Sequence, residues 1–205
     1  MLNEKFSIPV AILVLAVLFS FGSWSALPKY IGIFALVILA SVFAKKLAGH
    51  FLEVDVETEI WDFRRYWFAE RHKLKNPVPL GILIPLFIYM FSYGAFKWLA
   101  VLQTEFKSKI TKKIRKRKPW SFPEMREIDV ALICFSGILS SIVIALVAFA
   151  FSKEISLISL LYAFFNLLPI GKLDGTRLFF SSRIIYFISI LALAGASIIL
   201  AILQI

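Results

Sequence analysis

The chain is poor in the residues from which disulfides and metal sites are built, with one cysteine and two histidines among 205 residues. A lone cysteine, Cys134, cannot form an intramolecular disulfide, so it carries no information on the redox compartment. The sequence also lacks an internal repeat, a low-complexity linker and a long polar region. These absences leave no room for a separate soluble domain.

Apolar residues, in contrast, make up 60% of the chain, and the mean hydropathy is +0.85. Several runs approach the roughly 20 residues that a helix needs to span about 30 Å of hydrocarbon. The composition therefore predicts one integral membrane domain over residues 1–205, placed in the cell membrane.

Six apolar runs predict helices. They are Ser7–Leu27, Tyr30–Ala44, Leu80–Leu102, Val130–Phe151, Leu157–Ile170 and Leu178–Ile205. The first run is longer than the roughly 7–15 apolar residues of a cleaved signal peptide, so we expect it to be retained. The second is expected to end at Lys45 and Lys46. In the fourth, four small residues indicate close helix packing: Ser136, Gly137, Ser140 and Ser141.

Between the second and third runs the pattern changes. Residues Glu53–Ile60 alternate acidic with apolar or β-branched side chains, which predicts a strand with one polar face. The following segment, Trp61–Pro79, is rich in aromatic residues and arginine and suits a membrane interface.

The charge distribution decides how Leu80–Leu102 is placed. If it crossed the membrane, the basic segments Lys45–Lys75 and Lys107–Arg126 would lie on opposite faces, against the positive-inside rule. If it enters and returns, both lie on one cytoplasmic face, opposite Lys29 and Lys153. We therefore predict an all-α membrane protein with about five or six transmembrane helices, a re-entrant segment and a short membrane-associated β-strand region.

An ionisable residue ends the apolar run before the last helix, in the segment FFNLLPIGKLDG. Asp174 in this segment indicates a functional site, because charges in membrane segments are costly and face the protein interior. The segment resembles the N-x-x-P-x-x-x-L-D-G signature of the site-2 proteases, which are intramembrane zinc metalloproteases. The matching residues are Asn166, Pro169, Leu173, Asp174 and Gly175.

The resemblance covers most of the chain. In this family four elements follow one another along the chain, and the same order occurs here. They are a helix ending in H-E-x-x-H, a membrane-associated sheet, a helix with a glycine packing site, and the LDG segment. The resemblance implies that Asp174 occupies the position of the third zinc ligand. It also implies that the strand after the metal-binding helix receives substrate by edge pairing, which here assigns partner binding to Val54, Val56, Thr58 and Ile60.

The sequence departs from the family at the metal-binding helix. Ser41-Val42-Phe43-Ala44-Lys45 occupies the H-E-x-x-H position, so Ser41 and Lys45 replace the two histidine ligands and Val42 replaces the general base. Such catalysis needs two imidazoles one helical turn apart, a carboxylate and the intervening glutamate. We expect no catalytic residues, no bound metal and no cofactor.

The sequence offers three other sets of candidate catalytic residues. His50, Glu53, His72 and Asp174 have side chains that zinc accepts, but both histidines lie in interfacial segments. A serine mechanism lacks a nearby histidine, and an aspartyl mechanism lacks a second membrane carboxylate, because Asp129 is better explained by the dipole of its own helix.

Without zinc, Asp174 needs another partner. One hypothesis is that the ammonium of Lys45 replaces the metal and forms a salt bridge with Asp174. The alternative is that Lys45 and Lys46 extend to the lipid headgroups and mark the end of the helix.

A basic connector follows the third run. We expect its side chains to attract anionic lipid headgroups rather than nucleic acid, since the cluster is short and tethered to the membrane. These residues are Lys112, Lys113, Arg115, Lys116, Arg117 and Lys118.

Three functions are compatible with these features. The preferred interpretation is a non-catalytic site-2 protease-like protein, a pseudoprotease, that binds or regulates other membrane proteins. The alternatives are an active intramembrane zinc metalloprotease with a rearranged site, and a small membrane transporter or lipid-handling protein.

Overall fold

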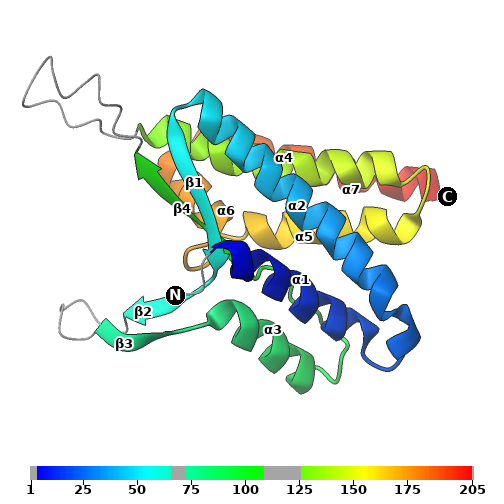
Figure 1. The fold of residues 1–205 in the computed structure, drawn as a ribbon. Helices are drawn as coiled ribbons and strands as arrows, with labels where there is room; N and C mark the ends of the chain where they lie inside the picture. Colours follow the sequence, from blue (N-terminus) through cyan, green and yellow to red (C-terminus); the bar gives the residue numbers. More distant parts are fainter. Residues whose placement is uncertain (1–3, 66–72, 109–125, 205) are drawn as a thin grey trace, which may run out of the picture.

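The computed structural model describes residues 4–65, 73–108 and 126–204. Most of these residues are helical (Figure 1). The helices are α1 (Glu4–Ser20), α2 (Leu27–Phe51), α3 (Leu80–Phe91), α4 (Glu127–Ala148), α5 (Lys153–Leu167), α6 (Asp174–Ser181) and α7 (Arg183–Gln204), with a short 3₁₀ turn at Trp24–Ala26. The strands are β1 (Val54–Ile60), β2 (Phe63–Arg65), β3 (Lys73–Val78) and β4 (Leu102–Ser108).

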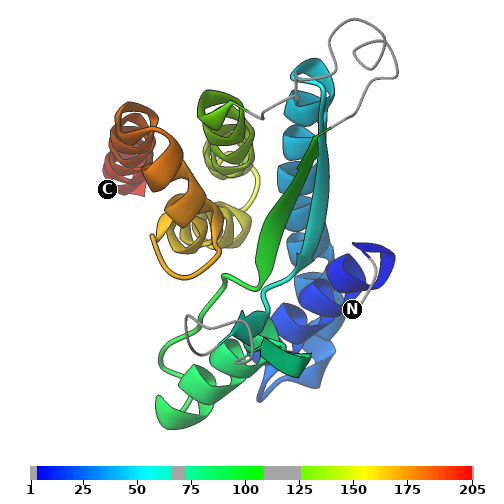
Figure 2. The ribbon, with the colours of Figure 1, turned by 90° about the vertical axis from the view of Figure 1, so that its left-hand side faces the viewer.

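Helix α2 is central to the helix packing. It packs against α1 on one side and α4 on the other, and α4 in turn contacts α5, α6 and α7. Figure 2 shows α1, α2 and the strands on one side and α4 to α7 on the other. The strands lie at one end of the helices, and the α1–α2 and α4–α5 connections lie at the other (Figure 1). There Lys29 Nζ lies 2.5 Å from Glu154 Oε2 and joins the starts of α2 and α5.

Three helical segments of the described chain are long and apolar enough to cross a membrane: Trp24–Phe51, Glu127–Ala148 and Arg183–Leu203. Large apolar side chains point outward from α7, where Ile184 and Leu191 are 74% and 70% exposed. Outward-facing apolar side chains are costly in water and favourable in lipid, which fits the predicted membrane class. Helices α1, α3 and α5, with 17, 12 and 15 residues, are shorter.

Several helix boundaries differ from the predicted ones. Helix α1 ends at Ser20, before Gly22, whose φ of 101° is in the left-handed region. The predicted end of the second helix at Lys45 is wrong, because α2 continues to Phe51. The predicted helix Leu178–Ile205 is two helices, α6 and α7, separated by Ser182, whose backbone is extended. The helices predicted over Val130–Phe151 and Leu157–Ile170 are α4 and α5.

The predicted strand is confirmed as β1, which pairs with β4 in an antiparallel two-stranded sheet. Its burial alternates, and Val54, Val56, Thr58 and Ile60 face the interior. The hairpin of β2 and β3 was not predicted, because Trp61–Pro79 has no clear period-two pattern.

The run Leu80–Leu102 doubles back on itself, as the re-entrant interpretation requires. Its two ends meet at Trp61, whose carbonyl accepts from Gly81 N–H (2.8 Å) and whose N–H donates to Val101 O (2.9 Å). A Cβ on Gly81 would lie 2.1 Å from Val101 O, so only glycine permits this approach. Between these ends the chain forms α3, a turn, and an extended limb that leads into β4.

Candidate functional site: a buried lysine–aspartate pair

Three elements distant in sequence bring polar side chains together in the interior. Lys45 comes from α2, Thr104 from β4 and Asp174 from the first turn of α6, and they are 3%, 0% and 1% exposed. The Lys45 ammonium forms an ion pair with Asp174 Oδ2. Thr104 Oγ1 donates to Asp174 Oδ1 (2.7 Å) and accepts from Lys45 Nζ (3.2 Å). Both carboxylate oxygens of Asp174 are therefore engaged.

A glycine provides the space for the lysine side chain. A Cβ on Gly137 of α4 would lie 2.3 Å from Lys45 Cε, so no larger residue fits without displacing the lysine. The Gly137 carbonyl accepts hydrogen bonds from Ser41 and Ser141, each at 3.2 Å. Small residues thus let α2 and α4 approach closely around the lysine, as the sequence indicated.

The LDG segment positions the aspartate. Leu173 is fully buried before α6 begins, and Asp174 lies in the first turn of α6, where the helix dipole favours a negative charge. A Cβ on Gly175 would lie 2.1 Å from Leu167 O, so the start of α6 is packed against the end of α5. Asn166 Nδ2 donates to Tyr162 O (2.9 Å) within α5, and Pro169 lies exposed between the two helices.

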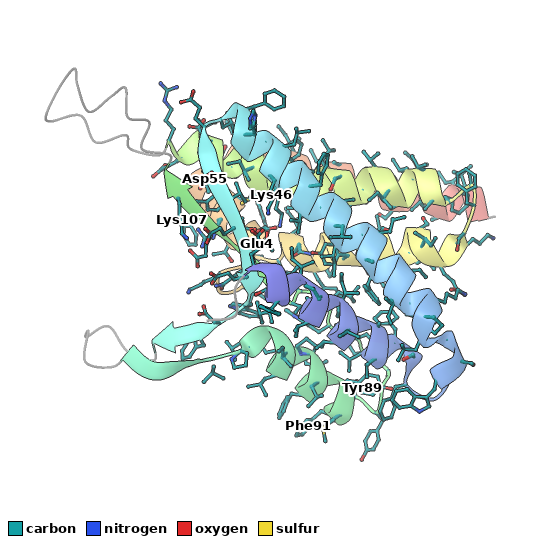
Figure 3. All side chains as sticks on the ribbon, in the orientation of Figure 1. Glu4, Lys46, Asp55, Tyr89, Phe91 and Lys107 are labelled. Atoms are coloured by element: carbon teal, nitrogen blue, oxygen red, sulfur yellow. The ribbon has the colours of Figure 1, made fainter. Side chains whose placement is uncertain are left out.

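The hypothesis that Lys45 pairs with Asp174 is confirmed, and the alternative that Lys45 extends to the headgroups is wrong. The adjacent lysine behaves differently: Lys46 is 46% exposed and pairs with Glu4 Oε1 at 2.7 Å (Figure 3). Because Asp174 compensates its charge in the interior, Lys45 can lie within α2 rather than at the end of that helix. Of the other two motif positions, Ser41 and Val42 are both buried.

The residues proposed for a rearranged metal site differ in how deeply they are buried. His50 and Glu53 are exposed at the end of α2, whereas Asp174 is buried, and His72 lies outside the described residues. Within the described ranges, no group of three or more His, Cys, Asp or Glu side chains is placed to hold one metal ion. Asp129 lies in the first turn of α4, as its assignment to that helix dipole requires.

A second polar network, which sequence reasoning missed, holds the α5–α6 connection to the sheet. Asp62 Oδ1 accepts from Gln103 Nε2 (3.0 Å) and Lys172 Nζ (3.2 Å). Arg177 Nη2 lies 3.4 Å from Glu105 Oε2. No pattern in the sequence predicts these pairs, because they join residues that are far apart in the chain.

In the part of the chain that the structure describes, β1, the strand assigned to partner binding, pairs only with β4, but its other side is not open: α1 and α2 contact β1, and Val54 O lies only 2.8 Å from where a Cβ on Gly49 of α2 would be. Trp61 N–H donates toward β4, so in the alternating antiparallel pattern the main-chain groups of Val54, Val56, Thr58 and Ile60 point away from β4. On that side Thr58 N–H donates to Glu4 Oε1 (3.4 Å). The six basic residues assigned to lipid headgroups, Lys112, Lys113, Arg115, Lys116, Arg117 and Lys118, lie outside the described residues.

The comparisons with known proteins add no relative: no protein-family model, no characterised protein and no solved structure matches this chain. The functional argument therefore depends on the site itself.

Proposed function

We propose that this protein is a membrane-embedded, non-catalytic protein of site-2 protease type, in which a lysine replaces the metal. The observation that carries the proposal is the buried ion pair of Lys45 and Asp174. A protonated lysine cannot ligate a metal, yet it balances the carboxylate charge that zinc would otherwise balance. The fold thereby keeps Asp174 in the interior without an ion.

The surroundings of the pair support the absence of hydrolysis. Ser41 hydrogen-bonds to a carbonyl of α4, and Val42 has no group that accepts a proton. The two carboxylate oxygens of Asp174 are already occupied by an ion pair with Lys45 and a hydrogen bond from Thr104. Peptide hydrolysis by a zinc-bound water needs a general base and an open metal position, and this arrangement offers neither.

The proposal includes a membrane orientation. In this orientation five helices cross the bilayer, namely α1, α2, α4, α5 and α7. The segment Leu80–Leu102 is re-entrant, and the sheet lies at the cytoplasmic face. Lys29 and Lys153 start helices at the opposite end from the sheet, while Lys107 lies in β4 and Lys46 pairs with Glu4 beside the sheet, which supports this orientation. Attraction of the connector to anionic headgroups remains part of the proposal.

The proposed role is binding of other membrane proteins through the edge of β1 that is not paired with β4. Strand addition uses main-chain hydrogen bonds and makes few demands on sequence. The main-chain groups of Val54, Val56, Thr58 and Ile60 that point away from β4 would supply those bonds, and α1 and α2 would have to make room while Glu4 releases Thr58 N–H.

Metal analysis tests the proposal. The protein purified without chelators should hold much less than one equivalent of zinc. A Ser41→His/Lys45→His variant should gain about one equivalent, because residues four apart share a helix face and Asp174 completes a three-ligand set. That zinc should be lost when Asp174→Ala is added.

A matched control places the same pair on the other face of α2. Phe43→His/Leu47→His has the same spacing, but positions 43 and 47 are 68% and 46% exposed, so this variant should gain no zinc that depends on Asp174. One equivalent of zinc in the unmodified protein, lost in Asp174→Asn, would instead favour the active metalloprotease. Failure of Ser41→His/Lys45→His to bind zinc would count against the site-2 protease type.

A further inference from the structure

The turn at the end of α3 carries an unusual combination of exposure and irregular backbone. Tyr93 and Gly94 have φ angles of 50° and 81°, and the turn is closed by hydrogen bonds from Gly94 N–H to Tyr89 O (2.9 Å) and from Phe96 N–H to Ser92 Oγ (3.1 Å). The Tyr93 side chain, although it lies on this well-formed turn, is 99% exposed.

Contacts with α1 fix the position of the turn. The Tyr89 ring meets Phe21 edge-on, with 5.3 Å between centroids, and Lys97 Nζ lies 4.3 Å from the centroid of the Phe19 ring. Phe19 and Phe21 flank the end of α1 at Ser20, whereas Glu4 begins α1 beside the sheet. The turn therefore lies at the end of α1 that is distant from the sheet, with Tyr89 directed toward that end (Figure 3).

Exposed aromatic rings gather around the turn. Phe21 and Trp24 come from the α1–α2 connection, and Phe91 and Tyr93 come from the end of α3. They are 64%, 66%, 72% and 99% exposed. We call these four residues the aromatic tip.

The backbone argues against placing this tip inside the hydrocarbon. Irregular backbone facing lipid does not occur at that depth, because its polar groups have no water to bind, and a lysine there is costly. Aromatic rings and lysine ammonium groups are favoured where hydrocarbon meets water. We infer that the aromatic tip anchors the protein in the lipid headgroup region of the membrane face opposite the sheet.

With the aromatic tip at this position, the membrane around α1 and α3 is expected to be thin. Helix α1 has 17 residues and α4 has 22, so at 1.5 Å per residue they are about 25 Å and about 33 Å long. With the tip at the far interface, the hydrocarbon beside α1 has to be thinner than the roughly 30 Å of an average bilayer.

Cysteine labelling tests this placement on the full chain in oriented membrane vesicles. In a Cys134→Ala background, Tyr93→Cys should react with a membrane-impermeant maleimide from the same side as Lys153→Cys at the start of α5. Tyr93 makes little contact with the rest of the protein, so its replacement should not disturb folding. Arg126→Cys, before α4, serves as the reference for the sheet side.

A lipid-facing position completes the set. Phe87 of α3 is 60% exposed on an apolar helix, and Phe87→Cys should react from neither side. Reaction of Tyr93→Cys from the Arg126 side would overturn the inference and place the whole segment on the sheet-side surface. Protection of Tyr93→Cys on both sides, as at Phe87, would also overturn it. The inference rests on the membrane orientation of the proposed function, but none of these outcomes depends on zinc, so failure of this test and failure of the metal test are distinguishable.

Discussion

Lysine–carboxylate pairs occur in two environments in this molecule. Lys45 and Asp174 are both buried, whereas Lys29 and Glu154, at the opposite end of the helices, are 56% and 53% exposed. An exposed pair exchanges its partner for water at little cost, but a buried charge that loses its partner has no such substitute. Burial, rather than pairing itself, therefore decides how much each charge matters to the fold.

The largest effect is expected when the buried pair loses one member. Lys45→Met leaves Asp174 as an uncompensated buried carboxylate and should lower the free energy of unfolding by about 3–5 kcal/mol. The measurement is thermal or denaturant unfolding in detergent. Lys46→Met is the matched control, since Lys46 is adjacent in sequence but half exposed, and it should change stability much less. Equal effects of the two variants would contradict the comparison.

Removing both charges sharpens this prediction. A buried ion pair replaced by apolar residues of similar volume is often neutral or stabilising. Lys45→Met/Asp174→Leu should therefore recover most of the stability lost in Lys45→Met alone. If the double variant is as unstable as the sum of the single ones, the two charges are not coupled.

The second effect concerns the space around the buried lysine. Gly137→Ala places a methyl group against Lys45 Cε and should destabilise the protein by about 1–3 kcal/mol, the usual cost of overpacking. Gly195→Ala in α7 meets no atom within 4 Å and should not destabilise. In a Lys45→Ala background the cost of Gly137→Ala should largely disappear. Persistence of that cost would show that another contact is responsible.

The sequence was sufficient to predict the elements whose pattern is local. The strand β1 followed from alternating residues, the helix runs from apolar length, and the return of Leu80–Leu102 from the distribution of lysine and arginine. The pairing of Lys45 with Asp174 was one of two hypotheses, and it followed from a resemblance in motif order. The first three inferences depend on residues close in sequence or on charge alone, whereas the pairing of Lys45 with Asp174 depends on the resemblance.

The remaining features depend on contacts between distant residues. The apolar run of the second helix was expected to end at Lys45 and Lys46, because charged residues usually mark such an end, and only the three-dimensional neighbours Thr104, Gly137 and Asp174 show why α2 continues. The pairing of Asp62 with Lys172 spans 110 positions and depends on how the α5–α6 connection packs against the residues that follow β1. Neither could be predicted from local sequence.

The smallest effect is expected at the exposed pairs. Lys107 Nζ donates to Glu57 Oε2 at 2.6 Å on the outer face of the sheet, and this hydrogen bond raises the pKa of Lys107. A lysine with a raised pKa adds stability that is present at neutral pH and is lost only as the pH rises through that pKa. Water and salt screen the pair, however, so Glu57→Gln should change the melting temperature by at most about 2 °C at neutral pH. Lys29→Met should behave alike. A loss at either position as large as that of Lys45→Met would mean that pairing, and not burial, sets the energetic weight of charges in this protein.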